Sequence, residues 1–224
     1  MLVLHGFSSS NYYNVAKLAL LEKGLPFEEA LVYSGAGETY RPDYLEHSPL
    51  GKVPCLQTDE GYISESRCIV EYLERAYPEN PLYPSSPFKV AKLLELTQVI
   101  DLYLELTARR LLPNYFTRKP APENIAKDVR ATLTKGVKAV TQLARFDQFL
   151  LGDRFTAADI AATLHFPLVR AISRKVLDCD PLAEVPGLLD YSARMEQRLH
   201  VQRIRKDQAA DQPAFFAHIQ KSSH

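Results

Sequence analysis

The start of the chain combines two short apolar runs with a helical pattern between them. Continuous apolar residues at 2–4 and 27–32 are typical of strands buried within a sheet. Residues 11–23 repeat apolar positions at helical spacing, and Gly24 and Pro26 mark where that helix should end. A strand, a helix and a strand in this order give parallel strands with a right-handed crossover. The chain therefore begins with a βαβ unit.

The next pattern predicts a hairpin that leads directly into a helix. Residues 53–56 predict a strand with Pro54 at its start, because proline has no N–H to give to a sheet ladder. A Thr-Asp-Glu-Gly turn at residues 58–61 reverses the chain, and Ser64 or Ser66 can cap the helix that follows. The order of elements is thus βαβ-ββα, the small mixed sheet of a thioredoxin-like domain.

A proline-rich segment separates this region from a wholly helical one. Residues 78–87 hold four prolines and form the clearest linker in the chain. Beyond it, residues 88–112 and 124–150 carry long helical patterns with no competing strand pattern. We therefore expect an α/β plus all-α architecture, with a thioredoxin-like domain at residues 1–77 and an all-helical bundle at residues 88–224.

The second half also contains a local helix-start signal. Thr156 and Asp159 have the spacing of a capping pair, in which each side chain satisfies a backbone N–H of the first helical turn. Residues 185–199 suggest one more helix that closes the bundle. From Arg203 on, the chain is polar apart from the pair at residues 215–216, and the pattern leaves open whether this tail packs or frays.

Charge and hydropathy narrow the range of partners. The 27 basic residues balance the 27 acidic ones, so no net charge draws the chain to nucleic acid or to anionic lipid. No apolar run approaches the length of a membrane span, and the N-terminal residues do not resemble a signal peptide. We expect a small-molecule or protein partner, with no nucleic acid and no membrane involved.

The cysteines argue for a reducing compartment. Cys55, Cys68 and Cys179 are odd in number, widely spaced and without a C-x-x-C motif, which argues against a disulfide framework and against a zinc site. Cys55 and Cys68 lie on predicted apolar faces and should be core residues rather than nucleophiles. We expect a cytoplasmic protein without a metal.

The helix start after the hairpin has the chemistry of an amino-acid site. Val53 should lie at the sheet end, where its backbone groups are free for a ligand. The first turn of the following helix presents N–H groups and a partial positive charge, which suit a carboxylate. Glu65 adds a negative charge, which suits an ammonium group. The two ends of an α-amino acid would both be satisfied here.

These motifs carry a family resemblance. The series S-P-L-G-K-V-P-x-L, a hairpin, and then E-S opening a helix resembles the glutathione site of the soluble glutathione transferase family. The resemblance implies that glutathione is the cosubstrate and that the Val53 backbone pairs with its cysteinyl part, beside a cis Pro54. It also implies that Glu65 and Ser66 hold the γ-glutamyl end and that Lys52 contacts the tripeptide.

The first loop should then hold the glutathione thiol. A hydroxyl hydrogen bond to sulfur favours the reactive thiolate. Serine-type transferases place this hydroxyl six residues before a Val-like helix position, which counts back from Val15 to Ser9, with Ser10 as the second choice. Asn11 stands where the zeta-class isomerases carry cysteine, which argues against a maleylacetoacetate isomerase. Ser9-x-Asn11 resembles instead the Thr-x-Asn of bacterial nu-class proteins, which reduce disulfides with glutathione.

The resemblance extends to a second-substrate pocket and to a dimer. The pocket should be lined from the first loop and the long helix, with Tyr103, Thr107, Arg110 and Tyr115 as candidates. The family forms homodimers, and Arg67 lies where an ion pair between subunits could form.

Three functions remain open on these observations. The leading one is a glutathione-dependent transferase that activates the thiol for attack on a small electrophile, as in detoxification. The second is a glutathione-dependent disulfide-bond reductase, which Asn11 favours. The third is a non-catalytic transferase-like binding module. The presence of Ser9, Val53, Pro54, Glu65 and Ser66 together argues against the third reading.

Overall fold

The chain forms two compact units in a computed structural model that describes residues 1–34 and 37–222. The thioredoxin-like unit comprises residues 1–82 together with the chain from residue 196 onward. The helical unit comprises residues 83–195. The C-terminal segment therefore groups with the first unit, whereas the sequence-based division placed everything after residue 87 in the helical domain.

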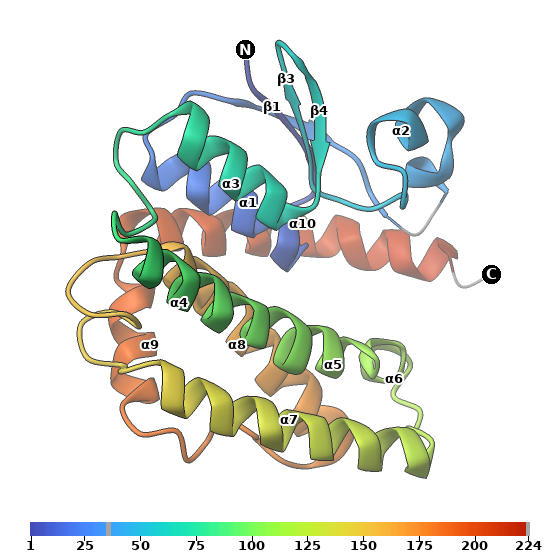
Figure 1. Ribbon diagram of the computed structural model, residues 1–224. Helices are drawn as coiled ribbons and strands as arrows, with labels where there is room; N and C mark the ends of the chain where they lie inside the picture. The colour runs from blue at the N-terminus through green and yellow to red at the C-terminus, as the bar shows by residue number, and fades with distance from the viewer. Residues whose placement is uncertain (35–36, 223–224) are drawn as a thin grey trace. The chain divides into compact units, whose positions relative to one another are not determined.

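A four-stranded mixed sheet forms the centre of the thioredoxin-like unit (Figure 1). Its strand order is β2-β1-β3-β4, with β1 and β2 parallel and the other two pairs antiparallel. This is the arrangement that the βαβ-ββα pattern predicts, so the fold class is confirmed. The strands are β1 (Val3–Gly6), β2 (Glu28–Leu31), β3 (Cys55–Thr58) and β4 (Gly61–Ser64).

α1 is the central helix of a packed group in this unit, and its apolar residues Val15 and Leu18 are fully buried. α1 contacts both α3 and α10, and α3 also packs on β3 and β4. The polar tail thus forms one long helix on α1 instead of fraying (Figure 1). The elements are α1 (Asn11–Glu22), η1 (Glu38–Tyr40), α2 (Pro42–His47), α3 (Ser66–Ala76) and α10 (Leu199–Ser222).

The helical unit is built around a π-helical segment, η2, against which α7 and α8 pack. Gly136 lets α7 approach closely, because a Cβ at this position would lie 2.8 Å from Leu104 Cδ2 and 3.0 Å from the Tyr103 carbonyl oxygen. The elements are α4 (Pro87–Gln98), η2 (Val99–Glu105), α5 (Leu106–Arg109), α6 (Leu112–Thr117), α7 (Glu123–Leu143), α8 (Ala157–Leu177) and α9 (Leu188–Glu196).

Two helix ends differ from the sequence-based expectation. The helix expected over 124–150 ends at Leu143, and Phe146 adopts a left-handed φ of 55°. The Arg194 guanidinium donates to the Phe146 carbonyl oxygen at 3.0 Å, so the irregular segment is satisfied by a distant side chain. The single helix expected over 185–199 is also two helices, α9 and α10.

The proline-rich linker is anchored to the thioredoxin-like unit at its first half. Leu82 is buried, and its N–H donates to the Glu74 carboxylate at 3.0 Å. The same carboxylate oxygen lies 3.0 Å from the buried Lys23 ammonium, and the Asn80 amide donates to the Lys23 carbonyl oxygen. The linker is therefore an ordered connection as far as Leu82.

Among the residues that the structure describes, no helix combines the length and the apolar composition that crossing a bilayer requires.

Candidate active site

The sheet register brings three segments together at one end of the thioredoxin-like unit. The antiparallel pairing of His5 with Cys55 places the residues just before β3 beside the loop that follows β1. The pairing of Cys55 with Ser64 places the residues just after β4 beside the same point. Val53 and Glu65, which are far from the first loop in sequence, therefore lie at the sheet end where that loop begins.

The segment before β3 is held in an extended conformation outside the ladder. The Val53-Pro54 peptide bond is cis, and the strand begins only at Cys55. Lys52 is exposed, while its carbonyl oxygen accepts hydrogen bonds from the Tyr44 hydroxyl at 3.0 Å and the Ser48 hydroxyl at 2.9 Å. The backbone leading to Val53 is thus fixed from one side, and Val53 itself takes no part in the strand register.

Glu65 occupies the N-cap position of α3 with a φ of 68°. The sequence-based choice of Ser64 or Ser66 as the cap is wrong, because Ser64 ends β4 and Ser66 is already the first residue of the helix. A positive φ costs a non-glycine residue on the order of 1–3 kcal/mol and is typical of functional sites. The Glu65 side chain is exposed and makes no capping hydrogen bond, so its carboxylate stands beside the first turn of α3.

The three consecutive serines of the first loop have different environments. Ser10 caps α1, because its hydroxyl oxygen accepts the Tyr13 N–H at 3.3 Å. The Ser8 carbonyl oxygen accepts the Asn14 amide at 2.7 Å. The Ser9 hydroxyl oxygen is buried and has no hydrogen-bond partner within the described part of the chain. The hydroxyl of Ser10 is therefore used as a cap, whereas the buried hydroxyl of Ser9 is not used by the described part of the fold.

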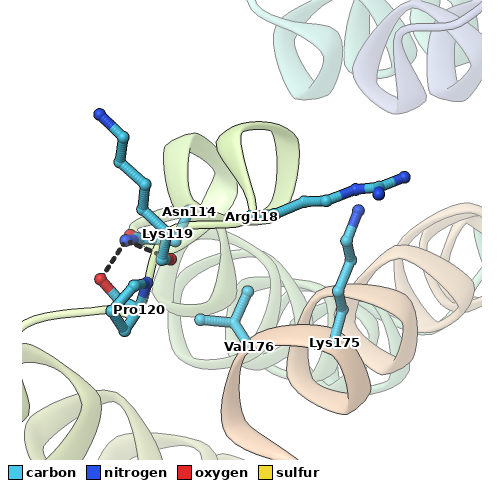
Figure 2. Close-up of a pocket in the computed structure, with 6 residues that line it drawn as sticks. All are labelled: Asn114, Arg118, Lys119, Pro120, Lys175 and Val176. Atoms are coloured by element: carbon cyan, nitrogen blue, oxygen red, sulfur yellow. Dashed lines mark hydrogen bonds between the residues drawn. The ribbon is translucent and has the colours of Figure 1, made fainter.

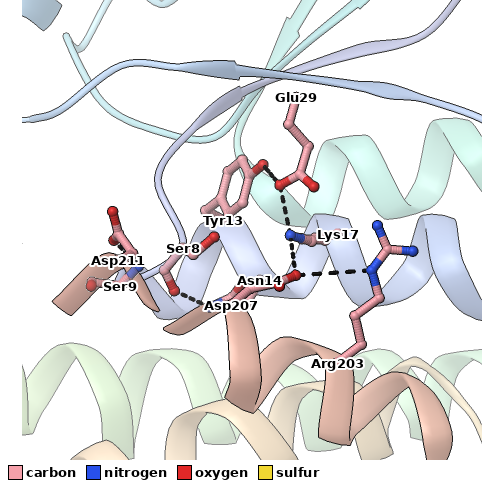
Figure 3. A network of polar contacts seen from close by, with 9 residues as sticks. All are labelled: Ser8, Ser9, Tyr13, Asn14, Lys17, Glu29, Arg203, Asp207 and Asp211. Atoms are coloured by element: carbon pink, nitrogen blue, oxygen red, sulfur yellow. Dashed lines mark hydrogen bonds and ion pairs between the residues drawn. The ribbon is translucent and has the colours of Figure 1, made fainter. Parts of the chain in front are cut away.

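The C-terminal helix closes over this loop. The Asp211 carboxylate accepts the Ser9 backbone N–H at 2.7 Å (Figure 3) and the Tyr33 hydroxyl at 2.5 Å. The ring of Phe215 stacks on Phe7 at 5.2 Å between centroids. Burial, followed by the bond to Asp211, raises the pKa of Tyr33 to about 12. Sequence reasoning missed these contacts, and the aromatic pair in a polar tail was the only local signal for them.

A buried lysine joins α10 to α1 and β2. Lys17 lies with its ammonium 2.6 Å from a Glu29 oxygen and 2.8 Å from an Asp207 oxygen, and only 1% of its side chain is exposed (Figure 3). Tyr13 donates its hydroxyl to the same Glu29 carboxylate, and burial together with this bond raises the pKa of Tyr13 far above its usual range. Gly6 accommodates the Tyr13 ring, because a Cβ there would lie 2.4 Å from a ring carbon.

Comparison with known proteins identifies the family of this chain. Residues 4–81 match the sequence model described as the N-terminal domain of glutathione S-transferase. A protein of Pseudomonas putida named glutathione S-transferase is 41% identical over 219 residues, which is 98% of either chain. The chain belongs to the glutathione S-transferase family. It is an enzyme of the glutathione transferase type, and the homologous enzymes use glutathione as a substrate.

Two further matches are a bacterial relative and a solved insect structure. A protein of Pseudomonas aeruginosa named maleylacetoacetate isomerase is 30% identical over 159 residues, covering 69% of this chain and 74% of its own. The solved glutathione S-transferase isozyme E7 of Drosophila melanogaster superposes with a TM-score of 0.79 at 20% identity, covering 99% of this chain and 96% of its own. The structural similarity carries the fold alone.

The four candidates for the second-substrate pocket differ in what their side chains already contact. Thr107 is buried and donates its hydroxyl to the Leu102 carbonyl oxygen at 3.0 Å, and Arg110 forms an ion pair with Asp128. Tyr103 is 50% exposed, so its ring is accessible. Tyr115 lies on α6 with the Lys175 ammonium 4.2 Å from its ring centroid.

A pocket of about 410 Å³ opens in the helical unit (Figure 2), and one of its lining residues is the Lys175 that lies over the Tyr115 ring. The Asn114 amide donates to the carbonyl oxygens of Lys119 and Pro120 and so fixes the turn after α6. Three of the residues that line this pocket have basic side chains. No role for any of them was predicted from the sequence. Its lining residues are Asn114, Arg118, Lys119, Pro120, Lys175 and Val176.

The cysteines lie outside this chemistry. Cys55 is fully buried, and burial raises the pKa of its thiol to about 11, which keeps it protonated and unreactive. Cys68 is exposed, which corrects the expectation that it lies in the core, because α3 turns Ile69, Val70 and Leu73 inward instead. Over residues 1–34 and 37–222, no three His, Cys, Asp or Glu side chains gather as metal ligands would.

Proposed function

We propose that the enzyme conjugates glutathione to a small electrophile, with the Ser9 hydroxyl donating a hydrogen bond to the glutathione thiolate. The observation that carries this proposal is the buried Ser9 hydroxyl, which has no partner in the described structure although its neighbour Ser10 is used as a cap. A buried hydroxyl without a partner costs free energy, and a ligand atom that accepts from it removes that cost. The N-terminus of α1 adds a favourable dipole at the same loop.

The rest of the tripeptide would lie along the sheet end. The backbone of Val53 would pair with the cysteinyl part, since it lies outside the ladder register. The exposed Glu65 carboxylate would bind the α-ammonium of the γ-glutamyl end, and Ser66 with the first turn of α3 would bind its carboxylate. Lys52 is exposed at the same segment and would contact the glycine end.

The reaction itself requires a single new covalent bond. The thiol proton leaves to solvent, and the thiolate attacks the electrophilic carbon to form a carbon–sulfur bond. The electron pair of the broken bond departs with the leaving group, or takes a proton where the reaction is an addition. The Ser9 hydrogen bond lowers the thiol pKa and so raises the thiolate fraction at neutral pH.

Replacing Ser9 with alanine tests this function. We expect the KM for glutathione to stay within about twofold, because the other contacts remain, while kcat falls by about tenfold or more. The pKa of the bound thiol should rise by about one unit, which corresponds to ~1.4 kcal/mol. The ultraviolet absorbance of the thiolate, titrated against pH, measures this pKa directly.

Ser10→Ala is the matched comparison, because it removes the cap of α1 one residue away. It should lower the thermal midpoint and shift the thiol pKa less than Ser9→Ala does. A pKa shift in Ser10→Ala alone would mean that the active loop is misaligned by one residue. No shift in either variant would mean that backbone N–H groups and the dipole of α1 hold the thiolate.

Disulfide reduction is the second candidate, since Asn11 is buried at the first residue of α1 beside Ser9. Rates of the wild type on one aryl halide and on one model disulfide separate the two reactions.

We also propose that the enzyme works in a reducing compartment such as the cytoplasm, because its Cys55, Cys68 and Cys179 are free thiols.

We further propose a homodimer, supported by a row of exposed apolar side chains on α4, η2 and α5. Phe88 is 75% exposed, and Leu102 and Leu106 are 50% and 47% exposed. A two-fold interface would cover the same patch on both subunits.

Sedimentation tests the dimer. At micromolar concentration we expect twice the chain mass of 25.3 kDa, and we expect Leu102→Glu to shift the mass toward that of the monomer. Leu189→Glu, at an exposed leucine of α9, should leave the mass unchanged; a wild-type monomer would contradict the proposal.

A further inference from the structure

The backbone of Ser9 is tied to a residue 202 positions later in the chain. Asp211 Oδ2 accepts the Ser9 N–H at 2.7 Å, and Oδ1 accepts the Tyr33 hydroxyl at 2.5 Å. Both oxygens of this carboxylate are therefore engaged, one with the active loop and one with the segment after β2. The short distances are those of charge-assisted hydrogen bonds, which are about twice as strong as neutral ones.

Contacts on both sides of Asp211 fix its position on the thioredoxin-like unit. One turn earlier on α10, Asp207 pairs with the buried Lys17 (Figure 3). One turn later, Phe215 stacks on Phe7, and beyond it the His218 ring stacks on Tyr33 at 4.8 Å between centroids. The carboxylate is thus held at one place by ionic and aromatic contacts, as a positioning group must be.

We propose that Asp211 is a positioning residue for the transferase reaction, which holds the Ser9 backbone so that the Ser9 hydroxyl reaches the glutathione thiolate. This inference rests on the proposed role of Ser9. Asp211 already accepts the Ser9 N–H. The hydroxyl is therefore the donor group of Ser9 that can still form a hydrogen bond to sulfur. A hydroxyl on a loop without this anchor would spend less time in bonding geometry, so the thiolate would be stabilised less.

The charge of Asp211 acts in the opposite direction. A carboxylate near a thiolate disfavours the charged sulfur and raises its pKa. Removing the carboxylate therefore has two effects of opposite sign on the thiol, and a single substitution does not separate them. Asparagine does separate them, because its carbonyl oxygen can accept the Ser9 N–H while its amide donates to the Tyr33 oxygen. It keeps the anchor and removes the charge, whereas alanine removes both.

The experiment compares Asp211→Ala, Asp211→Asn and the control Asp207→Asn, which weakens the docking of the same helix one turn away without touching Ser9. For Asp211→Ala we expect the pKa of the bound glutathione thiol to rise by about one unit and kcat to fall by about tenfold, with the KM for glutathione within about twofold. For Asp211→Asn we expect kcat within about twofold of wild type and an equal or lower thiol pKa. For Asp207→Asn we expect a lower thermal midpoint and an unchanged thiol pKa.

Several results would overturn the proposal. A thiol pKa in Asp211→Ala no higher than that in Asp211→Asn would show that the anchor does not position the hydroxyl, because these two variants both lack the charge and differ in the anchor. A rise in Asp207→Asn equal to that in Asp211→Ala would show that the docking of α10, and not the bond to the Ser9 N–H, is responsible. If Asp211→Ala does not fold, Asp211→Glu keeps the charge but displaces the acceptor, and it must raise the thiol pKa. A null result for Ser9→Ala would instead refute the proposed function.

Discussion

Replacing Asp159 with alanine is expected to lower the free energy of unfolding by about 3–5 kcal/mol. Its carboxylate is fully buried and accepts four hydrogen bonds. The donors are the N–H groups of Leu150 at 2.9 Å and Thr156 at 2.8 Å, and the hydroxyls of Thr156 at 2.9 Å and Tyr191 at 3.0 Å. Alanine leaves all of them in the core without this acceptor, and each such buried group costs about 1–3 kcal/mol.

Asp159 therefore stabilises more of the structure than the capping pair that the sequence predicts. Thr156 and Asp159 form the capping box that their spacing predicts. Loss of a cap alone costs only about 0.5–2 kcal/mol. The additional cost comes from Leu150 and Tyr191, through which Asp159 also joins the preceding loop and α9 to the start of α8. Burial raises the pKa of Asp159, and the hydrogen bonds oppose that rise.

Urea unfolding measures the effect, with Asp153→Ala as the control, since Asp153 is exposed in the same segment and should change stability by less than about 0.5 kcal/mol. The KM for glutathione should hold in the folded fraction of Asp159→Ala. A variant of unchanged stability that had lost turnover would show that Asp159 takes part in catalysis.

Replacing Lys17 with methionine is expected to cost about 2–3 kcal/mol and to loosen α10. Methionine keeps most of the apolar stem but removes the ammonium that holds Glu29 and Asp207 together. Two carboxylates that share a cation then face each other without it. Their side chains are 36% and 31% exposed, so water reduces the cost below that of a fully buried pair.

Two measurements together check the Lys17 prediction. Urea unfolding gives the loss of stability, and limited proteolysis should cut more readily within residues 199–222 of the variant. Lys92→Met removes an exposed lysine that pairs with Glu95 on α4, and it should change stability by less than about 0.5 kcal/mol. Equal stability of the two variants would contradict a structural role for the Lys17 ion pairs.

The features that the sequence predicts well are those that neighbouring residues determine. Alternation and helical spacing predict the βαβ-ββα order, and the turn at residues 58–61 fixes the hairpin. The capping pair of Thr156 and Asp159 is likewise a matter of three residues. The closeness of Val53 and Glu65 belongs to the same class, because they lie within one hairpin-helix motif and the sheet register keeps them adjacent; their part in binding glutathione stays a prediction.

The features that the sequence does not predict depend on partners far along the chain. The cap of α3 is Glu65 in a strained conformation, although propensity favours a serine, because the surrounding structure and not local preference sets this φ. The helix after Glu123 ends at Leu143, and the irregular segment that follows it is held by a guanidinium from α9, which donates to the carbonyl of Phe146. No local sequence pattern marks Asp211, because its role depends on a contact with Ser9, 202 residues away in the chain.

The grouping of α10 with the thioredoxin-like unit has a consequence for how the protein is made. Residues 1–82 leave the ribosome first, but the helix that completes their unit is synthesised only after the whole of residues 83–195. Until α10 is synthesised, Lys17 and the Ser9 amide of the nascent N-terminal segment lack their partners on this helix. The proposed glutathione site thus reaches its final form only after α10 has been synthesised, when this helix closes a long loop at an entropic cost that grows slowly with loop length.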